Sequence, residues 1–170
     1  MLSLLTVLLL TLHLLSMNVA SAGPLVAMWL NRKRASSWSR DLGLRLAWHN
    51  FALLFFGIGF GLSLGITQWY FGGRDYPLTI NLFRSKVGWG IAELICSACW
   101  GWGYWAWLRY RPPQSAVARF CHAGLAFITA TNLLYHFPPL MTVMSQATSG
   151  QLAIAEHVDS AAYRQLVFTP

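Results

Sequence analysis

Residues 121–136, CHAGLAFITATNLLYH, hold two histidines fourteen positions apart in an otherwise apolar run. A helix turns by about 100° and rises by about 1.5 Å per residue, so His122 and His136 are expected on one helix face, about 21 Å apart along the axis. The run is part of a longer apolar segment, residues 116–146. About 20 residues suffice for a helix to cross the hydrocarbon core of a bilayer. This segment is therefore predicted to span a membrane with one imidazole toward each surface.

Three further apolar segments have a comparable length, at residues 2–30, 44–71 and 87–109. The chain of 170 residues is 56% hydrophobic and only 10% charged, which is too apolar for a soluble domain of this size. The fold class is therefore predicted as all-α, an integral membrane four-helix bundle over residues 1–146. Residues 147–170 are mixed in character, and they either form an extramembrane tail or lead to a further helix.

The first segment contains a stretch, VASAG, that resembles the cleavage site of a secretory signal. However, no Lys or Arg precedes the segment, His13 interrupts its apolar middle, and PLVAMWL continues it beyond the apparent site. Residues 2–30 are therefore expected to remain as a helix.

The formal charge of +7 lies in the connections between the apolar segments. Eight Lys and Arg residues follow the first and third segments, against four on the opposite side of the predicted bundle. Cytoplasmic loops carry the excess of basic residues, so both termini are predicted outside a bacterial cytoplasmic membrane. Because the charges form neither one stripe nor one tail, we expect membrane lipid and no nucleic acid as a partner.

Four histidines fall within the predicted spans. Counted from the side with the basic loops, His49 and His122 each lie about five or six residues deep, whereas His13 and His136 each lie about 17 to 20 deep. An imidazole from each of two helices at one height is the ligand set of a b-type haem, so these two level pairs predict two haem b groups stacked across the bilayer. In the alternative interpretation, each histidine only forms a hydrogen bond to a neighbouring helix.

Glycines lie near the predicted ligands. Gly57 and Gly61 lie one turn apart in the second span, and Gly124 lies beside His122 in the fourth. A macrocycle edge against a helix needs such small residues, but close packing of two helices needs them equally. The glycines are therefore candidate haem contacts that leave both interpretations open.

Two other features bear on the site. Glu93 is the one carboxylate in a predicted span, level with His13 and His136, and it is a candidate acceptor for a quinol proton. A protonated glutamate bonded to a neighbouring helix is the alternative. Pro138 and Pro139 follow His136 directly, so the last helix is expected either to end there or to kink and continue.

The distribution of histidines resembles that of the di-haem cytochrome b subunits of respiratory formate dehydrogenases and nickel–iron hydrogenases. One histidine lies in each of the first two spans, none in the third, and two, fourteen apart, in the fourth. The resemblance implies an electron-transfer subunit that carries two haem b groups and exchanges electrons with a quinone. It also implies a redox partner subunit, a cytochrome c or an iron–sulfur protein. A bd-type quinol oxidase-like subunit or fragment, and a cofactor-free membrane scaffold, remain as alternatives.

Overall fold

The computed structural model describes residues 2–32, 36–71, 75–135, 137–149, 158 and 160–168. Within these ranges all regular structure is helical, which confirms the predicted all-α class. The helices are α1 (Leu2–Leu30), α2 (Ser37–Phe71), α3 (Asp75–Leu82), α4 (Arg84–Tyr110), α5 (Ala116–Tyr135), α6 (Phe137–Thr148) and α7 (Ser160–Phe168).

Among the residues that the structure describes, three helical segments are long and apolar enough to cross a membrane. They are Leu4–Leu30, Ser37–Phe71 and Ala116–Thr148, the last of which combines α5 and α6. The chain therefore has the character of a membrane protein. The third predicted span corresponds to α4, which is long enough but not among these segments. Its interior contains Glu93, five tryptophans and four glycines, residues that add little or nothing to the hydropathy of a helix.

Short polar motifs set the boundaries of the helices on the basic side. The Ser36 hydroxyl accepts the backbone N–H of Ser39 at 3.2 Å, and the Ser115 hydroxyl accepts that of Ala118 at 3.0 Å. Both serines thus cap the first turn of a helix, α2 and α5 respectively. α4 ends at Tyr110, shortly before Pro112 and Pro113, which cannot continue its hydrogen bonding.

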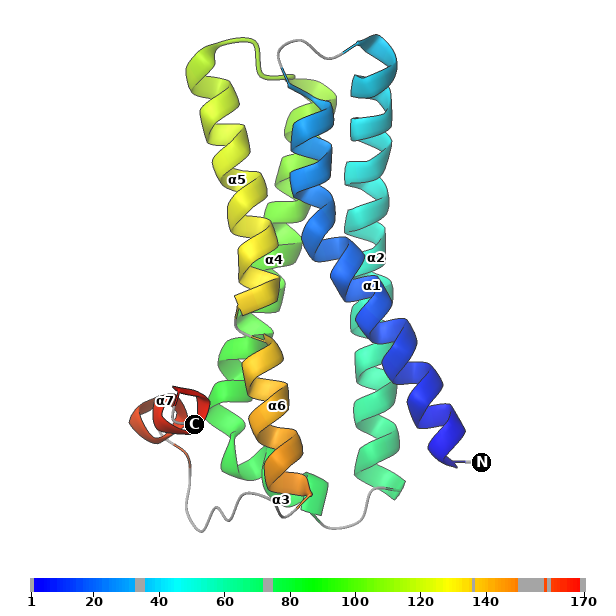
Figure 1. Cartoon of the computed structure of the whole chain (residues 1–170), viewed down its shortest axis with the longest axis vertical. Helices are drawn as coiled ribbons and strands as arrows, with labels where there is room; N and C mark the ends of the chain where they lie inside the picture. The colour runs from blue at the N-terminus through cyan, green and yellow to red at the C-terminus, as the bar shows by residue number, and fades with distance from the viewer. Residues whose placement is uncertain are drawn as a thin grey trace.

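Figure 1 shows α1, α2, α4 and the α5/α6 pair running along the long axis of the molecule. α1 packs on α2 and α5, and α4 packs on the same two helices from the other side. The C-terminal ends of α1 and α4 and the N-terminal ends of α2 and α5 lie at one end of the molecule, and the N-terminus lies toward the other, where α3 also lies (Figure 1). The helix ends that flank the two basic connections thus lie together, as the sequence predicts.

Within the described part of the chain, the buried side chains form three clusters along the helices. The cluster near the basic end consists of Ala27, Ala47, Tyr104, Leu108 and Ala126. The middle cluster consists of Ala20, Leu54 and Leu133. The cluster at the far end joins the turn between α3 and α4, helix α6 and Val158 before α7, and it consists of Phe83, Leu140, Val143, Met144 and Val158. Small residues dominate where α1 approaches its neighbours, which lets the backbones come close.

The proline pair lies near the start of α6. α5 ends at Tyr135 and α6 begins at Phe137, with Pro138 and Pro139 directly after it. Together the two helices form one apolar segment, Ala116–Thr148, that is long enough to cross a membrane. α6 continues along the direction of α5 (Figure 1). His136, the predicted second ligand on this segment, lies outside the described residues.

Candidate functional site

His122 is the predicted ligand that the structure places in the interior. It lies on α5, and only 3% of its surface is exposed. Its ring stacks on Tyr104 with 4.2 Å between centroids and 26° between planes, and it meets Trp107 edge-on at 5.7 Å. Its Nε2 atom is buried and has no hydrogen-bond partner among the described residues. This nitrogen is therefore free to donate, to accept or to bind an electrophile.

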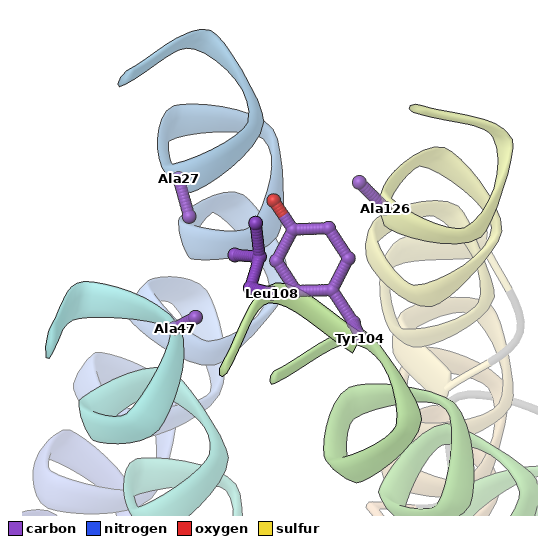
Figure 2. Packing of buried hydrophobic residues seen from close by; sticks show 5 residues of the cluster. All are labelled: Ala27, Ala47, Tyr104, Leu108 and Ala126. Atoms are coloured by element: carbon purple, nitrogen blue, oxygen red, sulfur yellow. The ribbon is translucent and has the colours of Figure 1, made fainter. Parts of the chain in front are cut away.

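Tyr104 fills the interior next to His122. Figure 2 shows its ring rising from α4 toward the space between Ala27 of α1 and Ala126 of α5, with the hydroxyl pointing between these two helices. The side chain is 1% exposed, and its hydroxyl has no hydrogen-bond partner within the described part of the chain. Alanines on the surrounding helices leave room for the aromatic ring.

His49 lies on the outer face of α2. Its ring is exposed, and its Nδ1 atom is 2.7 Å from the backbone carbonyl of Arg45 on the same helix. On α2 the buried Ala47 faces the core, and two residues at about 100° each turn His49 to the opposite side. The structure therefore does not bring His49 and His122 together.

Aromatic side chains fill the region between α2 and α4 at this level. The rings of Trp48 and Trp105 lie 4.9 Å apart, and Phe51 lies 5.9 Å from Trp48. A bis-histidine haem requires two imidazoles that face each other across a flat macrocycle. The described residues do not provide this arrangement for His49 and His122.

His13 connects α1 to α2. The half-buried ring has its Nδ1 atom 2.7 Å from the backbone carbonyl of Gly57. A Cβ atom at Gly61 would lie 2.8 Å from the Cε1 atom of His13, and one at Gly57 would lie 2.6 Å from the Sδ atom of Met17. Both glycines therefore let the side chains of α1 approach α2 closely. The predicted partner of His13, His136, is outside the described residues.

Gly124 differs from the two glycines of α2. A Cβ atom there would meet nothing within 4 Å among the atoms described. Its small size is thus not needed for packing against a neighbouring helix, and its predicted role as a haem contact remains a prediction.

Glu93 is half-buried on α4, at a position where hydrogen bonds connect α4 to α5. The side-chain amide of Asn132 donates to the backbone carbonyl of Glu93 at 3.0 Å and to the hydroxyl of Ser97 at 2.5 Å. Burial of the Tyr163 ring on α7 raises its pKa, and the negative charge of Glu93 raises it further. These contacts tie α4 to α5 and α7, and the role of Glu93 toward a quinol remains a prediction.

Sequence reasoning missed Asn50, Tyr104 and Asn132, each of which forms part of the interior. Asn50 is 3% exposed, and neither its amide nitrogen nor its carbonyl oxygen has a hydrogen-bond partner among the described residues. An asparagine inside an apolar span is costly to bury, so it marks an inward-facing position. That signal was present at both Asn50 and Asn132.

The described residues contain no group of three or more His, Cys, Asp or Glu side chains able to hold a metal ion. Cys96, Cys99 and Cys121 are free and exposed. Comparison with known protein families, with curated proteins and with solved structures finds no match for this chain.

Proposed function

We propose that this chain is a cofactor-free scaffold subunit of a membrane complex, in which the polar side chains of the interior hold the helices together. The observation that carries the proposal is the hydrogen bond from His13 to the carbonyl of Gly57, which uses an intramembrane imidazole to join α1 to α2. The pair of bonds from Asn132 does the same for α4 and α5. Such interhelical bonds are a general means of helix association in lipid.

In this proposal α4 crosses the membrane as the fourth helix of the bundle. It packs between α2 and α5, both of which are apolar enough to span a bilayer. Its outer face carries exposed apolar side chains, including Trp89, Ile91, Ile95 and Trp102, which suit contact with lipid or with helices of a partner subunit. Trp105, Trp107 and Tyr110 near its basic end suit an interfacial anchor.

The di-haem b-type cytochrome is the second candidate. One observation favours it, namely the buried Nε2 atom of His122, which has no partner in the described part of the chain and so resembles a nitrogen available to iron. In that case His122 and His49 would hold one haem, His13 and His136 the other, and the haems would pass electrons to or from a quinone. The outward position of His49 opposes this candidate.

Visible spectroscopy distinguishes the two candidates. The protein is expressed with excess haem, purified in mild detergent, and examined by its reduced-minus-oxidised spectrum and by haem content per chain. The scaffold proposal predicts less than about one haem in ten chains and no b-type bands. Two haems per chain with low-spin bands, one of which is lost in His122→Ala, would overturn it in favour of the cytochrome.

A further inference from the structure

A small cavity lies between α1, α2, α4 and α5 in the middle of the molecule. Its volume is about 10 Å³, and its lining includes Ala20, Pro24, Asn50 and Thr129. A cavity of about this volume is the smallest that holds a single water molecule, provided that polar groups surround it. The lining supplies such groups from three helices.

Asn50 supplies the first of these groups. Its side chain is 97% buried, since 3% of its surface is exposed, and both polar atoms of its amide have no partner among the described residues. The amide lies directly against Gly23 of α1, where any side chain would collide with it. Glycine at this position thus brings the asparagine to the backbone of α1 beside Pro24.

The second polar group is the backbone carbonyl of Ala20, which Pro24 leaves without its helical hydrogen bond. It lies within α1 and carries no backbone N–H, so the carbonyl of Ala20, four residues earlier, loses its usual helical donor. Ala20 and Pro24 both line the cavity. In lipid, a carbonyl freed by proline is satisfied by a neighbouring helix or by an ordered water.

Thr129 supplies a third group from α5. It is 2% exposed, and its hydroxyl donates to the carbonyl of Leu125 at 2.8 Å. The hydroxyl oxygen keeps its lone pairs, which are available to a donor in the cavity.

We propose that this cavity is a binding site for one structural water molecule, which accepts a hydrogen bond from the Asn50 amide and donates to the Ala20 carbonyl freed by Pro24. Thr129 offers a second acceptor for the other water proton. One water molecule would thus satisfy both the carbonyl freed by Pro24 in α1 and the buried amide of Asn50 in α2. It is separate from the histidines, so it stands whether or not the chain binds haem.

Hydroxyl-radical footprinting of the wild-type protein in lipid nanodiscs tests the proposal. X-ray pulses generate radicals from bound water, and mass spectrometry then measures the oxidation of nearby side chains. Leu54 lines the cavity and is 3% exposed, so bulk radicals do not reach it. We expect oxidation of Leu54 in the wild type and a fall of at least threefold in Asn50→Leu, which removes the amide and fills the space.

Asn18→Leu is the matched control, because Asn18 is exposed on α1 and does not line the cavity. It should leave the oxidation of Leu54 unchanged. Should Asn50→Leu fail to fold, Pro24→Ala restores the donor to Ala20 and is expected to lower the labelling as well. Absence of Leu54 oxidation in the wild type, or equal oxidation in Asn50→Leu or in a folded Pro24→Ala, would overturn the proposal.

Discussion

At the scale of single residues, the three described histidines of the predicted ligand set have three different environments. His13 bonds to the backbone of another helix, His49 bonds to its own helix and faces outward, and His122 is packed between aromatic rings. An imidazole that serves as a hydrogen-bond donor can be replaced by a side-chain amide of similar reach, whereas an axial haem ligand cannot. The two roles are therefore separable by substitution.

The first prediction concerns His13. His13→Leu removes the bond to Gly57 and should lower the free energy of unfolding by about 0.6 kcal/mol, with about 1.7 kcal/mol as the upper end for bonds of this kind. His13→Gln keeps a side-chain N–H donor and should recover at least half of this loss. Unfolding in mixed detergent micelles, followed by circular dichroism, measures both variants. Equal destabilisation by Leu and Gln would contradict the hydrogen-bonding role of His13.

At the scale of elements, the sequence predicted where the helices lie but not how each is rotated about its axis. The runs at residues 2–30 and 87–109 correspond closely to α1 and α4, and α2 begins at Ser37 rather than at residue 44. Lipid and protein interior are both apolar, so hydrophobic periodicity does not mark the inward face of a membrane helix. Counting residues from the basic side therefore predicted the depth of His49 in the membrane but not the face of α2 on which it lies. In the structure it lies on the outer face.

The two short helices, α3 and α7, were not predicted because neither forms an apolar run long enough to stand out in the sequence. α3 and α7 are helices of 8 and 9 residues, too short to cross a bilayer and stabilised by contacts at the far end of the molecule. Asn50 and Asn132 each stand as one amide in an apolar run, which marks both as inward-facing positions but does not say what they contact. Their contacts become visible only when the neighbouring helices are in place.

The second prediction concerns the junction of α4 and α5. Asn132→Ala removes the bonds to the Glu93 carbonyl and to the Ser97 hydroxyl, and it leaves the buried Ser97 without this donor. We expect a loss of about 1–2 kcal/mol of unfolding free energy, since two interhelical bonds are broken. Asn18→Ala, at an exposed position of α1, should change it by less than about 0.5 kcal/mol. Similar values for the two variants would show that the Asn132 bonds do not hold α4 on α5.

At the scale of the whole molecule, charge and shape together predict an orientation. The helix ends that flank the two connections richest in Lys and Arg lie at one end of the molecule, and the N-terminus lies toward the other (Figure 1). A bilayer across the long helices would therefore have the α1–α2 and α4–α5 connections in the cytoplasm. The α1–α2 and α4–α5 connections can share one side of the membrane only if an even number of crossings separates them. If α2 crosses, α4 must therefore cross as well.

Cysteine labelling tests this orientation and the status of α4 together. In a background with Cys96, Cys99 and Cys121 replaced by alanine, single cysteines are placed at Ser115, before α5, and at Ser149, after α6. A membrane-impermeant maleimide applied to intact bacterial spheroplasts should label Ser149→Cys at once, and Ser115→Cys only after lysis. Leu62→Cys, at an outward-facing position in the apolar part of α2, serves as a control that lipid should keep unlabelled.

The alternatives give different patterns in the same assay. A cysteine at Asp75, after α2, should behave like the one at Ser149 if α2, α4 and α5/α6 all cross the membrane. If α4 lay along the membrane surface instead, Asp75→Cys and Ser115→Cys would be labelled from the same side. If the bundle were inserted with the opposite orientation, Ser115→Cys would react in intact spheroplasts and Ser149→Cys would be protected. Either result would contradict the proposed four-span topology or its direction, and the cysteine at Asp75 identifies which of the two is wrong.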